Sequence, residues 1–441
     1  MSDDRPVTRG RRFLRLAGMT ASVAGQYAKS RIKSVFQSPE EAAAERAAVN
    51  ELNGELIAKT LGELKGAVMK VGQMASIASD ILPRELAEPL KALQKQAPPM
   101  AYEVIAEQIE SELGAPPETL FRRFEREPFA SASIGQVHRA TTDDGREVVV
   151  KVQYPGVDGA VDSDLAHLKL VLRAGGLMKV KKQDMDAVFR EVRARLMEEL
   201  DYCNEADNVR LFGEYHQKHS FVVVPEVVGE RSAQRVLTLT YEPGDSLDEL
   251  DAKGYSQATR DTIGEHLFRL MAEQLFDFRC IHADPNPGNL AIRPDGTIVL
   301  YDFGCIKKIP REVIEAYKAT IRAGLAEDYP GVERGLRALG VRRLDGPPVP
   351  YQFYKRWRDA FAEPFLGDEI FDYGRSTIHD DAMKLVPDSL KLLDSFQPPP
   401  ELVFIDRMVV GHYGNLRTIK ARGRFLDLLR PYFQNTPLVT A

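Results

Sequence analysis

The sequence predicts an α+β fold with two lobes, in which a small sheet is followed by a mainly helical region. Residues 134–142 and 146–153 have the pattern of two strands, joined by the hairpin turn Asp143-Asp144-Gly145. Apolar residues recur at helical spacing both before and after this hairpin. The chain has 441 residues, which is too long for one ordinary core and enough for two or three packed units.

Changes in composition along the chain predict four regions. Residues 1–37 form a basic segment, and residues 38–115 form a helical extension that begins at the capping sequence Ser38-Pro39-Glu40-Glu41. Residues 116–243 form the lobe with the sheet and a helical insert. Residues 244–441 form the helical lobe and the C-terminal helices.

Within the two lobes, the pattern predicts one long helix at about 184–212 and strands near 221–228 and 235–241. A helix at 257–279 and a strand pair within 290–301 follow, and helices continue from about residue 310. One side of the long helix is expected to carry the apolar residues Val188, Val192, Leu196, Leu200 and Cys203.

The overall composition excludes several classes of protein. A net charge of -6 and a pI near 5.9 argue against a nucleic-acid partner, which requires a dominant basic surface. Three cysteines fit no disulfide framework or zinc motif and indicate a reducing compartment. No apolar run approaches the roughly 18 residues that cross a bilayer. We therefore expect a cytoplasmic protein, peripheral at the inner face of a membrane if it touches one.

The basic segment 1–37 has two interpretations of equal weight. Its apolar residues at helical spacing are Phe13, Leu16, Thr20, Val23 and Tyr27. One interpretation is a helix that lies on an anionic membrane surface. The other is a helix that docks on the protein and exposes a solvated basic face.

Three side chains in a short stretch indicate nucleotide chemistry. Asp284 is followed by Asn289 in a Pro-rich loop, and Asp302 begins an Asp-Phe-Gly triplet after the predicted strand pair. Protein-kinase-like enzymes use this order and spacing to hold ATP and Mg²⁺. Asn289 and Asp302 offer the oxygen ligands that Mg²⁺ prefers, and Asp284 would orient the attacking group or accept its proton. Without the triplet, a Pro-rich turn alone would be the simpler interpretation.

The predicted hairpin contributes a candidate phosphate ligand, Lys151. Strand alternation places it opposite to its buried neighbours, facing the cleft of a kinase-like fold. Glu205 on the long helix is its expected partner. Glu199 and Asp201 are two residues apart, so they either serve different partners or lie where the helix is distorted.

Two further segments complete the expected site. Where kinases have a glycine-rich loop, this chain has Ala130-Ser131-Ala132-Ser133-Ile134-Gly135, which should be stiffer over the phosphates. On an earlier helix, Lys70 and Gln73 share a face with Gly62 and Gly66, which indicates a close contact with another element.

Together these residues resemble the UbiB/ADCK/ABC1 family of atypical kinases, over roughly residues 40–310. The matching segments are Lys70-Val71-Gly72-Gln73 (KxGQ), Phe129–Ser133 (alanine-rich loop), Lys151–Val157, Glu199-Leu200-Asp201 (ExD) with Glu205, and Asp284, Asn289 and Asp302. The chain differs from the family pattern at Ser131, which replaces an alanine, and it has no Ala-Pro-Glu segment after the triplet.

The resemblance implies a bilobal protein-kinase-like fold with a helical KxGQ extension that covers the cleft. Lys70 would pair with the ExD acids, and the extension would restrict phosphorylation of other proteins. The implied ligands are ATP and Mg²⁺. The implied role is in ubiquinone biosynthesis or related lipid metabolism, often with ATPase activity. The implied partners are membrane lipids or lipid-like quinone precursors, together with quinone-biosynthesis proteins.

Two other functions remain open from the sequence. A small-molecule kinase of the aminoglycoside or choline type shares the loop with Asp284 and Asn289 but has no inhibitory helix, and Lys70 and Gln73 argue against it. A non-catalytic scaffold could use ATP as a conformational ligand, but the chain has all the charged residues that the chemistry requires.

Overall fold

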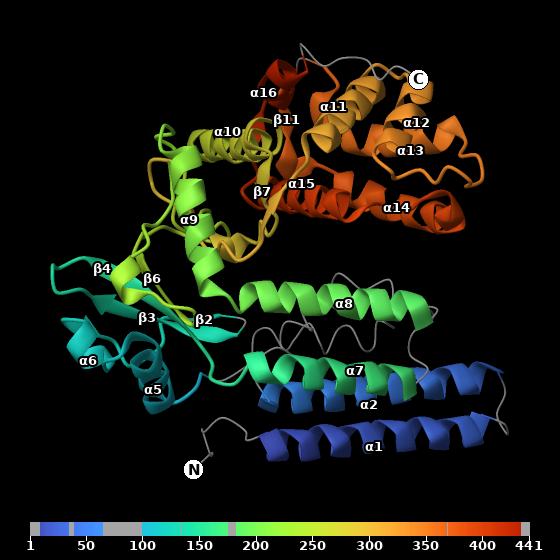
Figure 1. Ribbon diagram of the computed structural model, residues 1–441. Coiled ribbons are helices and arrows are strands. Elements are labelled where there is room, and N and C mark those ends of the chain that lie inside the picture. The colour runs from blue at the N-terminus through green and yellow to red at the C-terminus, as the bar shows by residue number, and fades with distance from the viewer. Residues whose placement is uncertain are drawn as a thin grey trace. The chain divides into compact units, whose positions relative to one another are not determined.

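The protein divides into two compact units, and each is described by itself. The computed structural model describes residues 9–34, 39–64, 99–132, 134–174, 182–367 and 369–433 (Figure 1). Unit 1 contains Met1–Asp207 and Glu226–Tyr241, and unit 2 contains Asn208–Pro225 and Glu242–Ala441.

Unit 1 is built on a five-stranded antiparallel sheet, with β2 paired to β3 beside the order β1-β3-β4-β6. Its strands are β1 (Arg123–Phe124), β2 (Ala130–Ala132), β3 (Gly135–Thr141), β4 (Glu147–Gln153) and β6 (Val236–Thr240). The predicted hairpin is confirmed as β3 and β4. Its turn contains Gly145 at φ +90°, a conformation that glycine adopts without strain.

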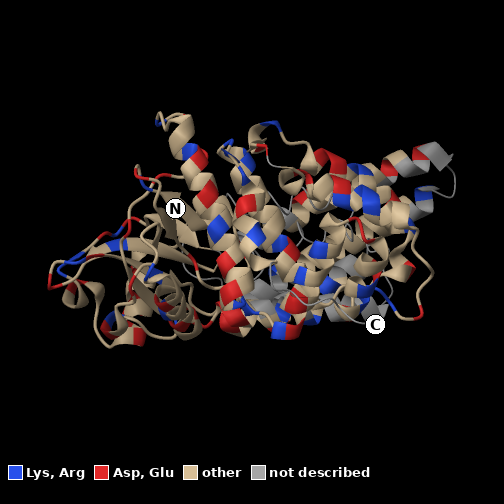
Figure 2. Ribbon diagram, turned by 90° about the horizontal axis from the view of Figure 1, so that it is seen from above, with Lys and Arg blue, Asp and Glu red and all other residues tan. Residues whose placement is uncertain are grey.

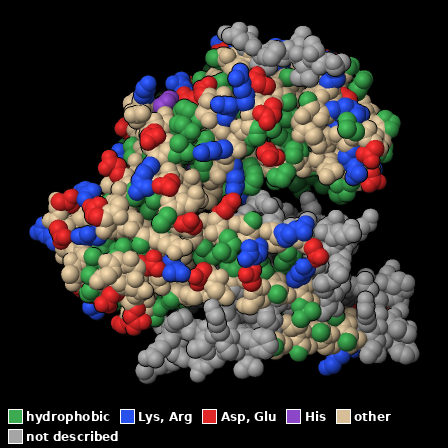
Figure 3. Space-filling view, in the orientation of Figure 1, with side chains coloured by type: hydrophobic (Ala, Val, Ile, Leu, Met, Phe, Trp, Pro, Cys, Tyr) green, Lys and Arg blue, Asp and Glu red, His purple; other side chains and the backbone are tan. Residues whose placement is uncertain are grey.

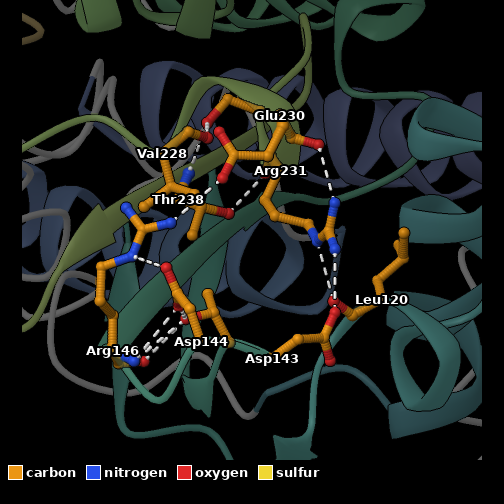
Figure 4. Close-up of polar contacts among 10 residues, drawn as sticks. Leu120, Asp143, Asp144, Arg146, Val228, Glu230, Arg231 and Thr238 are labelled. Atoms are coloured by element: carbon orange, nitrogen blue, oxygen red, sulfur yellow. Dashed lines mark hydrogen bonds and ion pairs between the residues drawn. The ribbon is translucent and has the colours of Figure 1, made fainter.

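The outer end of this hairpin is held by a polar network (Figure 4). Arg146 bonds to Asp144 within the turn at 2.7 Å and to Glu230 at 3.2 Å. Arg231 donates from Nε to the Leu120 carbonyl at 2.8 Å, and its Nη2 lies 3.4 Å from Asp143. Exposed pairs of this kind are each worth about 0.2–1 kcal/mol, so the network sets the position of the turn more than it sets stability.

One face of the sheet forms the core of unit 1. Val148, Val150 and Val152 are almost completely buried and pack with Ile105 and Ile109 of helix α5 (Tyr102–Leu113). The two isoleucines are four residues apart and therefore lie on one face of α5. The alternation that buries the valines turns the residue between Val150 and Val152 to the other face of the sheet.

The remaining part of unit 1 is helical. Its helices are α1 (Arg9–Ser34), α2 (Pro39–Leu64), α5 (Tyr102–Leu113), α6 (Pro117–Leu120), α7 (Val161–Ala174), α8 (Lys182–Glu199) and the start of α9 (Tyr202–His216). Helix α1 packs against α2 and α7 (Figure 1). Val23 and Tyr27 of its predicted apolar stripe are buried, and the Tyr27 hydroxyl donates to Asn50 of α2 at 2.9 Å. This part of the stripe therefore docks on the protein, as one of the two interpretations expected.

The long helix predicted at 184–212 is interrupted at Leu200 and Asp201, so that part of the prediction was wrong. The Asp201 carboxylate accepts from the backbone N–H groups of Cys203 and Asn204 at 3.1 and 3.3 Å and caps the start of α9. The Leu200 carbonyl accepts instead from the Gln153 side chain on β4, at 2.9 Å. Because a new helix starts at Tyr202, Cys203 is exposed, although it was expected on the apolar side of one long helix.

Unit 2 is mainly helical and has three small sheets: β5-β9-β8, β10-β7 and β11-β12. Its strands are β5 (Val222–Val223), β7 (Cys280–His282), β8 (Leu290–Ile292), β9 (Ile298–Leu300), β10 (Ile306–Lys308), β11 (Phe371–Asp372) and β12 (Arg422–Gly423). The predicted strand at 221–228 is shorter than expected. It pairs in parallel with β9 in unit 2 and is not part of the unit 1 sheet.

The helices of unit 2 surround a core that includes Ile263, Leu267 and Phe268 of α10, all completely buried. These helices are the end of α9, α10 (Gln257–Glu273), α11 (Arg311–Leu325), α12 (Tyr329–Ala338), α13 (Tyr351–Phe361), α14 (Ile378–Lys391), α15 (Pro400–Thr418) and α16 (Phe425–Leu429). The predicted helix 257–279 ends in a π-helical turn, Gln274–Phe278, and is followed by Arg279 at φ +52°.

Basic and acidic residues are interspersed along the described helices (Figure 2). Among the residues described, no helix combines the length and the hydropathy needed to cross a membrane.

Candidate active site

Unit 1 brings Lys151 and Glu205 together as a buried ion pair. Lys151 Nζ lies 2.9 Å from both carboxylate oxygens of Glu205, and the two side chains are 15% and 4% exposed. The ring of Tyr202 lies 5.1 Å from the same nitrogen. Strand alternation points Lys151 away from the valine core, and the first turn of α9 carries Glu205 toward it. This is the pairing that the sequence predicted.

The alanine-rich segment forms a tight hairpin beside this pair. Ala130, Ser131 and Ala132 make up β2, and Ala132 pairs with Gly135 on β3. A Cβ on Gly135 would lie 2.2 Å from the Val152 carbonyl oxygen, so the close approach of β4 requires glycine there. Ser133 lies outside the described residues.

The two ExD acids have different surroundings because α8 ends between them. Asp201 caps α9 through its carboxylate, while Glu199 is the last residue of α8 and is half-buried. The sequence left open whether these acids serve different partners or lie at a distortion. The helix is distorted at this point. Lys70 and Gln73, the other expected parts of this motif, lie outside the described residues.

Unit 2 brings Asp284 and Asn289 together in one loop after β7. The Asn289 side-chain nitrogen donates to the Asp284 carbonyl at 3.0 Å and to its carboxylate at 3.2 Å. The Asn289 N–H donates to the Asn286 carbonyl at 2.8 Å, and the Asn289 carbonyl accepts from the Tyr301 N–H at 2.8 Å. The five-residue spacing therefore closes a hydrogen-bonded loop, with the two functional side chains on it in contact.

His282 connects this loop to the Asp-Phe-Gly segment. Its Nε2 lies 2.8 Å from the Asp302 carbonyl oxygen, and its Nδ1 lies 3.4 Å from the Asp284 N–H nitrogen. A carbonyl only accepts and an N–H only donates, so both contacts are satisfied by the neutral tautomer with its proton on Nε2. The buried histidine thus sets the spacing of the two acidic residues. Sequence reasoning had not assigned it a role.

Asp302 has a left-handed backbone, with φ +53°. The next residue holds it there: Phe303 is completely buried, and its carbonyl accepts from the Asn208 side chain at 3.0 Å. Aspartate tolerates this conformation better than most residues, and such backbones often accompany functional sites. The Asp302 side chain belongs to an exposed residue, so its carboxylate is accessible from solvent. The carboxylate of Asp302 and the amide oxygen of Asn289 are both hard oxygen donors of the kind that Mg²⁺ prefers.

Arg407 of α15 is a site residue that the sequence analysis missed. Its Nη2 lies 2.6 Å from one carboxylate oxygen of Asp284, while Asn289 holds the other oxygen. Helix α15 packs closely on the loop. A Cβ on Gly411 would lie 2.3 Å from Pro285 Cγ, so the approach leaves no room for a larger residue there. Asn415 also donates to the Pro285 carbonyl, at 3.0 Å. Arg407, Gly411 and Asn415 follow one another at intervals of four residues and therefore share one face of α15. No local signal in the sequence indicated that this face contacts the loop.

His412, on the same helix, makes the stability of unit 2 pH-dependent. Burial, and secondarily the neighbouring His282, lower the pKa of His412 from 6.5 to about 3. As the pH falls below 6.5 the unfolded chain gains a proton that the folded chain does not bind, so stability is lost between pH 6.5 and about 3. The expected slope is about 1.4 kcal/mol per pH unit from this group. Urea midpoints of His412→Gln should depend less on pH in this window, whereas exposed His379→Gln should behave like the wild type.

Comparisons with known proteins agree with this geometry. Residues 92–335, more than half of the chain, match the family model described as ABC1 atypical kinase-like domain. Atypical kinase COQ8, mitochondrial, from Saccharomyces cerevisiae is 30% identical over 80% of this chain and 70% of its own length. A solved structure of Rv3197 with erythromycin, from Mycobacterium tuberculosis, has a TM-score of 0.63 at 30% identity. The match covers 89% of this chain and 97% of the chain in that structure.

A plant relative extends well beyond the shared region. Protein ACTIVITY OF BC1 COMPLEX KINASE 7, chloroplastic, from Arabidopsis thaliana is 39% identical over 56% of this chain, and that match covers 36% of its own length. The chain thus spans about a third of this relative. The α+β kinase-like fold and the family resemblance predicted from the sequence are confirmed: the chain belongs to the ABC1 atypical kinase family.

Proposed function

We propose that the protein binds ATP with Mg²⁺ and transfers or hydrolyses the terminal phosphate, in support of isoprenoid-quinone synthesis or related lipid metabolism at a membrane surface. The observation that carries this proposal is the hydrogen-bonded group of Asp284, Asn289 and His282, which bonds to the backbone of Asp302. The family implies ATP, and the relative from yeast carries the name of a mitochondrial atypical kinase.

Each residue has a role that follows from its chemistry. Asn289 and Asp302 would hold Mg²⁺ through oxygen atoms, and the ion would neutralise charge on the phosphates. Asp284 would orient the attacking hydroxyl or water and accept its proton, with Arg407 and Asn289 fixing its carboxylate. Lys151, oriented by Glu205, would bind the α- and β-phosphates. Lys70 and Gln73 would cover the acceptor side, as the resemblance implies.

An apolar surface beside Asp284 supports a lipid-like acceptor over a polar small molecule. Val403 and Val410 of α15 are 39% and 54% exposed, and they lie on the helix face of Arg407, four residues before and three after it. Further exposed apolar side chains lie on the C-terminal helices, including Met383 and Leu390 of α14, and hydrophobic groups are visible on this part of the surface in Figure 3. An aminoglycoside-like acceptor would require acidic and polar groups at such a surface.

Mg²⁺-dependent ATP binding and hydrolysis, measured with and without anionic liposomes, test the proposal. We expect Asp302→Asn to abolish the Mg²⁺-dependent part of both, because the carboxylate ligand is lost while the fold is retained. Asp295→Asn makes the same chemical change at the exposed turn between β8 and β9 and should leave both signals intact. Absence of nucleotide binding by the wild type in either condition would refute the function proposed.

A further inference from the structure

A cluster in unit 2 unrelated to the phosphate chemistry contains two histidines and a glutamate. His216 is the last residue of α9, His219 lies in the turn that follows, and Glu273 is the last residue of α10 (Figure 1). One potential ligand atom from each lies within 4.8 Å of the others. His219 Nδ1 and Glu273 Oε2 are already 3.5 Å apart, which is close to the ligand–ligand spacing around a tetrahedral ion.

Three buried polar atoms of this cluster have no hydrogen-bond partner among the described residues. His216 is 2% exposed, and neither of its ring nitrogens has a hydrogen-bond partner in the part of the chain that the structure describes. Oε2 of Glu273 is buried and likewise has none. A buried polar group without a partner costs about 1–3 kcal/mol, so a protein retains such groups when something else satisfies them.

Two of the rings that contact His216 offer it no hydrogen bond. The rings of Phe212 and Phe278 lie 5.9 and 5.3 Å from the imidazole, and both are apolar. The turn that brings the second histidine close is fixed by the backbone, because the His219 N–H donates to the His216 carbonyl at 2.9 Å. Two imidazoles and one carboxylate therefore converge at a site where His216 is buried and the other two side chains are partly exposed.

We propose that His216, His219 and Glu273 bind a divalent transition-metal ion of the zinc class. Imidazole nitrogen with one carboxylate is a typical ligand set for Zn²⁺, with a water in the fourth position, and it is a poor one for Mg²⁺. The ion would connect the C-terminal ends of α9 and α10 and the start of the segment that enters β5. This site is separate from the Mg²⁺ ligands of the proposed function, so either proposal can fail without the other.

The site should bind more weakly than a structural zinc site in a zinc finger. Metal-bound histidines usually donate their second nitrogen to a carboxylate or a carbonyl, and loss of such a contact costs about 10–100-fold in affinity. Among the described residues, His216 has no such second partner. We therefore expect reversible binding that responds to chelators.

The experiment uses the full chain, stripped with EDTA and kept free of nucleotide. Isothermal titration with ZnCl₂ should give one site per chain. In thermal unfolding, Zn²⁺ should raise the midpoint temperature, and Co²⁺ should give the visible absorption of a tetrahedral site. His219→Ala and Glu273→Gln change partly exposed residues and should fold, and each should weaken Zn²⁺ binding by more than about 100-fold. His379→Ala, at an exposed histidine, and Cys203→Ser, at an exposed thiol, are the matched controls.

The outcomes separate clearly. Loss of the Zn²⁺ site and of the Co²⁺ spectrum in the two cluster variants, with both controls unchanged, supports the proposal. Zn²⁺ binding that survives in His219→Ala and Glu273→Gln, or that disappears in Cys203→Ser, overturns it, as does absence of binding to the wild type. ATP binding in Mg²⁺ should be retained in the cluster variants, and this measurement keeps the test independent of the nucleotide site.

Discussion

Lys151→Met is expected to destabilise unit 1 by about 3–5 kcal/mol, because it removes the ammonium group that contacts both oxygens of the buried Glu205 carboxylate. The two side chains are 15% and 4% exposed, and Lys151 contacts both carboxylate oxygens, so water cannot easily replace the lost ammonium group. Methionine fills a similar volume, which limits the contribution of a cavity. Hydrogen exchange of the β4 and β6 amides measures the opening of this sheet.

A second substitution distinguishes charge burial from packing. Glu205→Gln removes the buried negative charge, so the double variant Lys151→Met/Glu205→Gln should recover most of the lost stability. Its affinity for ATP should stay low, because the lysine proposed to bind the phosphates is still absent. The only tryptophan of the chain, Trp357, lies in α13 of unit 2, and its fluorescence provides an internal control for that unit.

If the double variant remained as unstable as Lys151→Met, the pair would contribute by packing rather than by charge. If the double variant bound ATP with the affinity of the wild type, Lys151 would have no part in phosphate binding. The stability and the binding measurements thus test two separate claims about one residue.

Local patterns predicted the elements whose hydrogen bonds are local. The β3–β4 hairpin depends on its own turn residues and on strand alternation, and both can be identified from consecutive residues. The pairing of Asn289 with Asp284 closes within five residues. Lys151 and Glu205 are 54 residues apart, and Glu205 was expected as the partner from its place on the long helix, without any local signal that relates the two residues.

The features that were missed depend on contacts distant in sequence. The break before α9 is stabilised by Gln153, 47 residues away from Leu200, so helical periodicity continued across it. The segment around β5 was expected with the sheet lobe, but its partner is β9, which follows it by more than 70 residues. Arg407 lies 123 residues from Asp284 and beyond the part of the chain that matches the family model.

Arg407→Ala is expected to reduce kcat by about 100-fold with little change in the KM for ATP, since a misplacement of about 1 Å in a reacting group can cost this much. Arg407 and Asn289 each hold one oxygen of the Asp284 carboxylate, so loss of the arginine frees the carboxylate to rotate about its remaining contact. The ion pair is partly exposed, 32% and 26%, and should contribute at most about 1 kcal/mol to folding. A large change in rate with a small change in stability is the signature of positioning.

A double-mutant cycle makes this argument specific to Asp284. Asp284→Asn alone should abolish turnover, and adding Arg407→Ala should have no further effect, because residues that act as one unit are strongly non-additive.

Arg407→Lys keeps the charge but loses the planar fork, so its rate should fall between those of the wild type and the alanine variant. Arg417→Ala, an exposed arginine on the same helix, should leave kcat unchanged. Equal losses in Arg407→Ala and Arg417→Ala would show that α15 acts through its overall charge, and an increase in rate would identify the ion pair as an inhibitory contact.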